Sequence, residues 1–176
     1  VFMLLIASVK ASSEVEVYLI DAAYLLDKIN TKEKASSLDR MIKKSKTNGR
    51  ISLREKAIAT YQLIYFNVDE VKLPQAFIDL EIIKVLYRLS FEEALDLYKS
   101  LYLICFLEDN NYTVNDLLEI IQLKRLTFLP SEIREIILST RNSVKKYGVL
   151  KYFNKIKECN EKFLTKDQTI EFIISQ

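Results

Sequence analysis

Histidine and tryptophan are absent from this 176-residue chain, and glycine, proline and cysteine occur only twice each. Histidine is the commonest general base and metal ligand near neutral pH, so its absence removes the Ser-His and Cys-His pairs that activate nucleophiles. Two cysteines without histidine cannot build a structural zinc site. The two glycines, Gly49 and Gly148, lie far apart, which excludes a glycine-rich phosphate loop. We therefore expect a protein that is not an enzyme and that uses no cofactor and no metal ion.

The scarcity of glycine and proline also predicts the fold, because these residues interrupt helices and strands. Apolar residues make up 49% of the chain and recur every three or four positions, which is the period of an amphipathic helix. No apolar run approaches the roughly 20 residues that a membrane-spanning helix needs. We predict an all-α fold, a single compact multi-helix bundle of about eight or nine helices.

Three segments have the pattern of a capping box, in which a Ser or Thr at the helix N-cap is followed three residues later by Glu or Gln. These segments begin at Ser52, Ser90 and Thr165. The segments 74–89 and 90–107 are apolar on nearly all sides, so we expect them to be two buried central helices. We find no residues that recur at a constant spacing, and we therefore do not expect a helical-repeat array.

Residues 1–11 form a short apolar run followed by small and branched residues, which is typical of the end of a secretory signal peptide. We therefore divide the chain into a signal-peptide remnant (1–11) and a single helical domain (12–176). This division predicts a secreted protein. The alternative is a cytoplasmic protein in which the first residues belong to a buried helix or strand.

Secretion carries two further predictions. Asn111 lies in an Asn-Tyr-Thr sequon within a polar stretch, which makes it a glycosylation site. Cys105 and Cys159 are the two cysteines of the chain, and in an oxidising compartment we expect them to form a disulfide. In a reducing cytosol both would instead be small buried hydrophobic residues.

Charge is distributed along the chain as basic, acidic and basic segments. Segment 28–50 has eight Lys or Arg residues against two acidic ones, and segment 141–157 has six and no acidic residue. The acidic residues between these segments, among them Asp79 and Glu81, are expected on the solvated surface. The net charge of the whole chain is only +2, so nucleic acid is not the favoured partner.

The second basic segment also contains aromatic residues between its lysines. Lys151 and Lys155 are one helical turn apart and share a helix face, where they could contact phosphate groups. In that case Tyr152 would stack on a base, or Phe153 would enter a membrane interface.

Tyrosine is the most abundant aromatic residue, with ten copies. Several tyrosines near one another can line a cavity in which their hydroxyl groups orient an amphiphilic ligand. We select five tyrosines of the predicted central helices and of the helix before them as candidate ligand-binding residues: Tyr61, Tyr65, Tyr87, Tyr98 and Tyr102.

These observations support one leading function and two alternatives. The leading prediction is a non-enzymatic, secreted helical binding protein that buries an apolar or amphiphilic small ligand, or a partner surface, between its helices. The first alternative is an intracellular adaptor or regulator that presents a groove to a partner protein. The second alternative is binding of nucleic acid or an anionic membrane through the basic segments 28–50 and 141–157.

Overall fold

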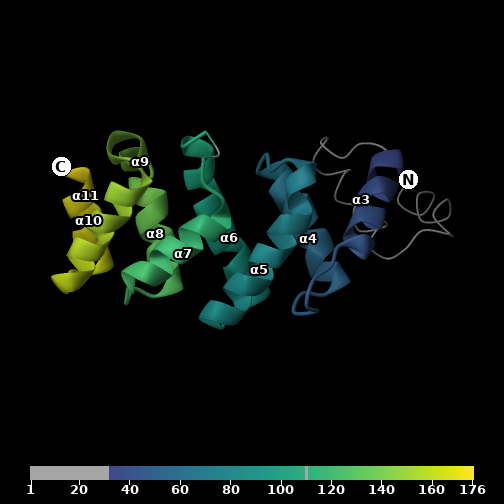
Figure 1. The fold of residues 1–176 in the computed structure, drawn as a ribbon, viewed down its shortest axis with the longest axis horizontal. Helices are drawn as coiled ribbons and strands as arrows, with labels where there is room; N and C mark the ends of the chain where they lie inside the picture. Colours follow the sequence, from purple (N-terminus) through teal and green to yellow (C-terminus); the bar gives the residue numbers. More distant parts are fainter. Residues whose placement is uncertain (1–31, 110) are drawn as a thin grey trace, which may run out of the picture. The chain divides into compact units, whose positions relative to one another are not determined.

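The structure, a computed structural model, describes residues 32–109 and 111–176. Every regular element in this part of the chain is helical, which confirms the all-α prediction (Figure 1). The signal segment predicted at 1–11 and a helix expected at 14–29 lie outside the described residues.

Nine α-helices and one 3₁₀ helix make up the described part of the chain. Their bounds are α3 (Lys32–Lys44), α4 (Leu53–Tyr65), η1 (Glu70–Lys72), α5 (Leu73–Tyr87), α6 (Phe91–Leu107), α7 (Val114–Lys124), α8 (Pro130–Thr140), α9 (Asn142–Tyr147), α10 (Val149–Glu161) and α11 (Lys166–Ile174). The contacts divide the chain into two compact units, one up to Lys84 and one from Val85 onward, and each is described by itself. The single domain predicted over residues 12–176 stays a prediction.

In the first unit, α3 packs against α4, and a turn joins them. The buried face of α3 carries Ala35, Leu38 and Ile42, at the helical spacing that the sequence predicts. The turn contains Gly49 with φ +78°, a left-handed conformation that glycine adopts without steric cost. Ser52 then starts α4, so a strong turn signal and a capping box fix the end of one helix and the beginning of the next.

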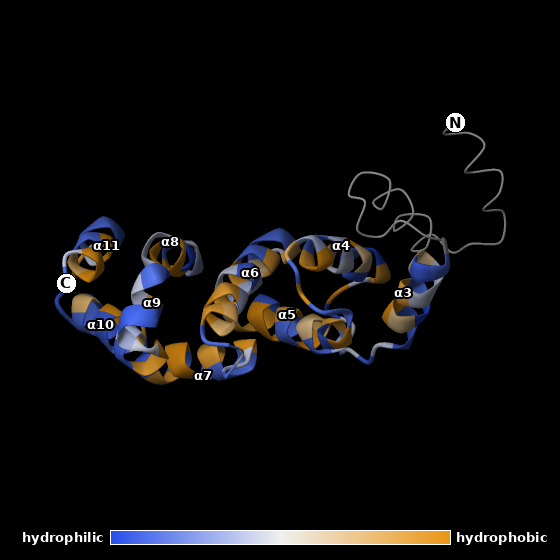
Figure 2. Ribbon diagram, turned by 90° about the horizontal axis from the view of Figure 1, so that it is seen from above, coloured by the Kyte–Doolittle hydropathy of each residue, from blue (hydrophilic) through white to orange (hydrophobic). Residues whose placement is uncertain are grey.

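The second unit has two rows of helices. In one row α8 lies between α6 and α11 and contacts both, and in the other row α7 contacts α10 (Figure 2). The rows are joined because α6 also contacts α7 and α10 also contacts α11. The short helix α9 contacts α6 and α10. Some successive helices therefore pack together, namely α6 with α7, α9 with α10 and α10 with α11, and helices two or three apart in sequence also lie side by side.

The starts of four helices recur along the chain at a nearly constant interval. The N-caps of α4, α6, α8 and α11 are residues 52, 90, 129 and 165, which gives intervals of 38, 39 and 36 residues. In each case the residue three positions later accepts a hydrogen bond from the N-cap N–H, over 2.6 to 3.0 Å; these acceptors are Glu55, Glu93, Glu132 and Gln168. The N-cap of α8 is Leu129, which has no side-chain acceptor, so this helix has only half of the box.

The starts of these four helices lie 36 to 39 residues apart, but no residue type recurs at a constant spacing, so the prediction about recurring residues is not contradicted. What recurs at this interval is the hydrogen bond of the N-cap and a buried position within the helix, and not a particular residue type. The residue eight positions after each N-cap is buried in all four helices, although its type differs: Thr60, Tyr98, Ile137 and Ile173. A search for identical residue types at a fixed spacing does not detect such a pattern.

The two helices expected at the centre differ in their packing. Ten residues of α6 are buried, including both of its tyrosines, in agreement with the prediction. On α5, however, Asp79 and Glu81 are buried while Ile82, Val85 and Leu86 are exposed. The buried face of α5 is therefore partly acidic, and its last turns present an apolar stripe to the outside.

The capping box of α6 provides a test of how much a helix start contributes to stability. Ser90 Oγ accepts from the Glu93 N–H over 3.3 Å and donates to Glu93 Oε2 over 2.7 Å. We expect Ser90→Ala to lower the free energy of unfolding by about 1 kcal/mol, measured by urea denaturation. Ser139→Ala, at an exposed position inside α8, is the matched control and should change stability by less than about 0.5 kcal/mol. Equal effects of the two substitutions would contradict a role of the cap.

Candidate functional site

A cavity of about 340 Å³ lies in the second unit, between the end of α5 and the first turns of α6 and α8. Its volume is within the range of small-molecule sites. Aliphatic and aromatic side chains form much of its wall, together with three charged groups. The lining residues are Tyr87, Leu89, Glu93, Asp96, Leu97, Leu129, Pro130, Ser131 and Arg134.

The charged groups of the cavity are of both signs. Arg134 Nη1 lies 3.7 Å from Asp96 Oδ2, and the other oxygen of Asp96 pairs with Lys99 at 3.0 Å. Glu93 is held at the rim by the Ser90 cap, whose hydrogen bonds lower the pKa of the Glu93 carboxyl and keep it ionised. Burial raises the pKa of Tyr87, so its phenol stays protonated at neutral pH. The wall therefore offers hydrogen-bond donors and acceptors close together.

The structure places the five candidate tyrosines in different surroundings. Tyr87 lines the cavity. Tyr98 and Tyr102 are buried and stack on each other, with ring centroids 6.2 Å apart and planes at 14°. Tyr61 and Tyr65 lie on α4 in the first unit, where Tyr65 is 60% exposed. The tyrosine site remains a prediction, and Tyr87 is the member of the set that lies in the cavity wall.

Most cavity residues were not predicted from the sequence. Leu129, Pro130 and Arg134 come from α8 and its N-cap, more than thirty residues after the α6 residues that they face. No local pattern indicates that these segments meet. Two cavity residues had a signal: Tyr87 is one of the candidate tyrosines, and the capping box at Ser90 predicts that the Glu93 carboxylate lies at a helix start.

In the first unit, Glu81 binds the backbone of the turn between α3 and α4. Its Oε2 accepts from the Asn48 N–H over 2.7 Å, and its Oε1 accepts from the N–H groups of Arg50 and Ile51 over 2.7 and 3.3 Å. Successive backbone N–H groups form a favourable site for an anion, and here the anion belongs to the protein itself. The expectation that Asp79 and Glu81 lie on the solvated surface is wrong, since each is only 3% exposed.

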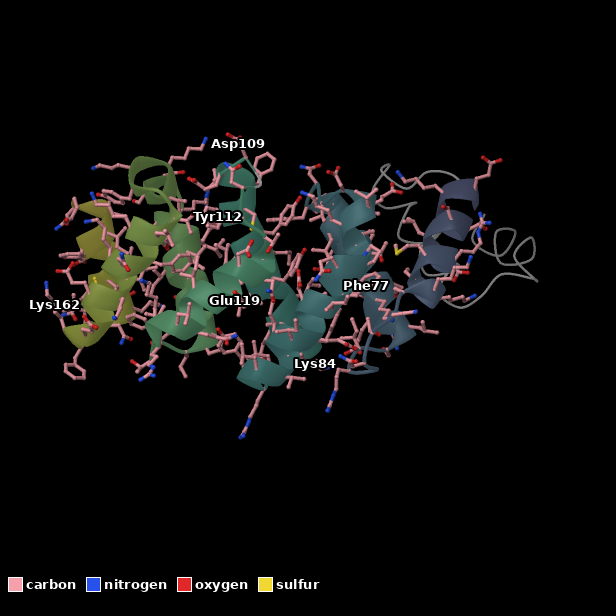
Figure 3. All side chains as sticks on the ribbon, viewed as in Figure 1. Phe77, Lys84, Asp109, Tyr112, Glu119 and Lys162 are labelled. Carbon is pink, nitrogen blue, oxygen red and sulfur yellow. The ribbon has the colours of Figure 1, made fainter. Side chains whose placement is uncertain are left out.

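Two lysines complete this polar network. Lys56 is 5% exposed; its Nζ donates to the main-chain oxygen and the Oγ of Ser45 and lies 5.9 Å from the Phe77 ring centroid. Burial lowers the pKa of Lys56, and the nearby charge of Glu81 acts in the opposite direction. Lys84 donates to the main-chain oxygen of Arg50 over 3.0 Å (Phe77 and Lys84 are labelled in Figure 3). The network thus fastens the turn to α4 and α5, which is a structural role.

The second basic segment differs from its prediction in one respect. Tyr152 and Phe153 are fully buried, and Tyr152 shares a 2.7 Å hydrogen bond with Thr140 Oγ1. Neither ring can therefore stack on a base or enter a membrane. The spacing of these residues with Ile156 on one apolar face of α10 was the signal for burial.

The lysines of this region instead gather around two other rings. The Nζ atoms of Lys146, Lys151 and Lys155 lie 5.3, 5.8 and 4.6 Å from the Tyr147 ring centroid. Lys155 and Lys162 lie 5.7 and 5.5 Å from the Phe172 ring centroid. We call these six residues the lysine–aromatic strip: Lys146, Tyr147, Lys151, Lys155, Lys162 and Phe172. Figure 3 labels Lys162 at the end of α10.

Cys105 on α6 and Cys159 on α10 are both buried, and no disulfide joins them. The structure therefore does not show the predicted bridge, and both side chains are buried instead. Burial raises the pKa of the Cys159 thiol, which keeps it protonated and unreactive. Asn111 is exposed in the loop between α6 and α7, and its glycosylation stays a prediction.

Two further properties concern the described residues alone. Within residues 32–109 and 111–176, no group of three or more Cys, Asp and Glu side chains is arranged to hold a metal ion. None of the helices seen in the structure has the length and apolar character needed to cross a bilayer.

Comparison of the chain with protein-family models, with curated proteins and with solved structures finds no match.

The buried carboxylate of Asp79 predicts a pH dependence. Burial raises the pKa of Asp79, although Gln75 donates to it over 2.9 Å. The folded state therefore binds this proton more tightly than the unfolded state, and stability falls as the pH rises through the folded pKa. We expect Asp79→Asn to raise the free energy of unfolding at pH 7 and to have no effect below the ordinary Asp pKa of about 3.9.

The measurement for Asp79→Asn is urea denaturation across a pH series. Asp69→Asn, which changes an exposed carboxylate whose side chain makes no cap hydrogen bond, is the control and should show no such difference. A variant that is less stable than the wild type at pH 7 would refute the assignment.

The turn-binding carboxylate of Glu81 gives a second stability prediction. Glu81→Gln replaces one charged acceptor with an amide N–H₂ that faces backbone donors, so we expect a loss of about 2 kcal/mol in the free energy of unfolding. Glu92→Gln, at an exposed position on α6, should leave stability unchanged within about 0.5 kcal/mol. If the two variants unfold at the same urea concentration, Glu81 does not hold the turn.

Proposed function

We propose that this protein is a non-enzymatic helical binding protein that holds a small amphiphilic ligand in the cavity at the starts of α6 and α8. The observation that carries the proposal is the combination of a 340 Å³ space, an aliphatic wall and a few converging polar groups in one unit of the fold. This combination is typical of small-molecule sites.

The wall determines the chemistry of the ligand. Leu89, Leu97 and Pro130 suit an apolar body. Arg134 and Asp96 face the same space with opposite charges, so a head group with a fixed charge would meet one of them unfavourably. An uncharged head that both donates and accepts hydrogen bonds, such as a hydroxyl or an amide, fits both.

The mouth of the cavity supports ligand entry without opening of the core. Leu129 lines the cavity but is 63% exposed. A bound ligand would cover this side chain, and removal of apolar surface from water is favourable by about 25 cal/mol per Å². Binding therefore gains from surface that the unliganded protein leaves in contact with water.

The exposed stripe on α5 favours the adaptor function as a second candidate. Val85 and Leu86, on the part of α5 that belongs to the second unit, are exposed, and exposed apolar side chains of this kind are typical of the surface that an adaptor presents to a partner protein. Replacing Val85 and Leu86 together with serine tests whether these two side chains are exposed in solution. If the stripe is open in solution, the double variant should keep the wild-type stability within about 1 kcal/mol.

Secretion remains our proposal for the location, with the cytoplasm as the alternative. The proposal rests on residues 1–11, whose composition resembles the end of a signal peptide. Intact-mass measurement of natively expressed protein decides it: loss of residues 1–11 supports secretion, and their retention supports the cytoplasm.

The cavity site is tested by filling it. Ser131 is exposed and lines the cavity in the first turn of α8, so Ser131→Trp should occupy the space without disturbing the core. We expect the wild type to bind the uncharged fluorescent amphiphile N-phenyl-1-naphthylamine and Ser131→Trp to bind it at least about tenfold more weakly, which corresponds to about 1.4 kcal/mol.

Ser139→Trp introduces the same side chain at an exposed position further along α8, outside the cavity, and is the matched control. It should bind the probe like the wild type. If both variants lose binding, or if neither does, the probe binds elsewhere and the proposed function is wrong.

A further inference from the structure

The lysine–aromatic strip concentrates positive charge, of which the Glu158 side chain balances only part. Three ammonium groups, those of Lys146, Lys151 and Lys155, lie within 5.8 Å of one ring centroid. Cation–π attraction by Tyr147 offsets part of their mutual repulsion, but a ring carries no net charge. Such a cluster raises the local concentration of anions.

The hydrogen bonds of the strip go to Gln176 and to one acidic side chain. Lys155 Nζ donates to the neutral amide oxygen of Gln176 over 2.8 Å, and Lys146 Nζ donates to the main-chain oxygen of the same residue over 2.7 Å. Among the described residues, an acidic side chain that pairs with a strip lysine is Glu158, which lies 2.6 Å from Lys162. This pair and the charge of Lys155 lower the pKa of Glu158.

The groups of the strip are connected through shared contacts. Lys155 contacts both rings, so the order along the surface is Lys146 and Lys151, then Tyr147, Lys155, Phe172 and Lys162. From Lys151 to Lys162 the helix rises by roughly 16 Å, which is longer than a single phosphate group. Both rings are partly exposed between the lysines. Alternation of cations and half-exposed rings matches a chain of phosphates and unpaired bases.

The surroundings of the strip favour nucleic acid over a membrane. Peripheral membrane sites insert exposed large apolar side chains beside their lysines. Leu150 is exposed on α10, but it lies about 140° around the helix from Lys155. Tyr152 and Phe153 are buried. Phe163, the residue after Lys162, is 93% exposed, so one large apolar side chain stands at the end of the strip. From Lys146 to Lys155 the strip consists of lysines and the half-exposed ring of Tyr147, which suits nucleic acid better than a membrane.

We propose that the lysine–aromatic strip on α9, α10 and α11 is a binding site for single-stranded nucleic acid, in which the lysines contact phosphates and the rings of Tyr147 and Phe172 stack on bases. The site lies apart from the cavity in its residues, since the two share none. It goes beyond the proposed function and does not depend on it.

The primary experiment measures fluorescence anisotropy of a fluorescein-labelled single-stranded oligouridylate with the full chain. We expect the affinity to fall as salt rises from about 50 to 200 mM, with a slope of about −0.7 for each phosphate contacted. Lys151→Glu with Lys155→Glu should weaken binding about tenfold or more and reduce the steepness of the salt dependence by about 1.4. The milder pair Lys151→Gln with Lys155→Gln should weaken binding in the same direction.

A charge-matched control uses two exposed lysines of the first basic segment. Lys44→Glu with Lys46→Glu gives the same net charge as the strip variant but changes the first unit. Its affinity should stay within about twofold of the wild type at 200 mM salt. Equal weakening by both pairs would mean that binding follows net charge, and the strip assignment would be overturned.

The stacking role of Tyr147 needs its own pair of variants. The Tyr147 hydroxyl is buried and makes no hydrogen bond, so Tyr147→Phe keeps the ring and should retain binding. Tyr147→Leu removes the ring and should weaken binding about fivefold or more. If leucine binds as well as phenylalanine, the ring does not stack on a base.

Two further outcomes would overturn the proposal. One is the absence of oligonucleotide binding at about 50 mM salt by protein that is folded by circular dichroism. The other is binding of phosphatidylserine vesicles, but not of the oligonucleotide, that is lost in the strip variant, which would assign the strip to a lipid surface. Ser131→Trp, the cavity variant, should leave oligonucleotide binding unchanged, so failure of one proposal is distinguishable from failure of the other.

Discussion

The N–H groups at the start of an α-helix have no partner within the helix, and the architecture of this protein depends on how they are satisfied. A short hydroxyl side chain at the N-cap and an acid or amide three residues later meet the requirement at Ser52, Ser90 and Thr165. These caps determine where the helices begin, and so which faces meet in the two rows of the second unit. They also place Glu93 at the rim of the cavity.

Local patterns in the sequence predicted much of the fold, because caps, turns and apolar stripes act over a few residues. The capping boxes, the end of α9 at Gly148 and the buried face of α6 all follow from such patterns. The break between α8 and α9 did not, since the apolar spacing continues through Arg141. The sequence pattern also did not predict the spacing of the helix starts, because burial and cap chemistry recur at these positions while residue identity does not.

The polar sites depend on contacts between distant segments, and sequence patterns are weakest there. Glu81 accepts hydrogen bonds from backbone N–H groups about thirty residues earlier in the chain. The local sequence pattern does not indicate this contact, and it therefore predicts a solvated carboxylate. Arg134 on α8 pairs with Asp96 on α6, a helix that contacts α8 in the same row. The prediction that Tyr152 and Phe153 are exposed was wrong for a different reason. Their neighbouring lysines suggested exposure, although the apolar spacing of α10 indicated burial.

In the part of the chain that the structure describes, five residues other than glycine adopt left-handed backbone conformations, at the ends of helices: Asn67, Arg88, Asp109, Arg125 and Phe163. This explains how a chain with two glycines makes so many reversals. A left-handed residue with a Cβ atom costs about 1–2 kcal/mol relative to the ordinary conformation. Phe163 is 93% exposed, so its ring contributes little burial in return. These helix ends therefore lower the stability of the folded protein. Substitutions that relieve the backbone cost at these positions would raise its melting temperature without any change in the core.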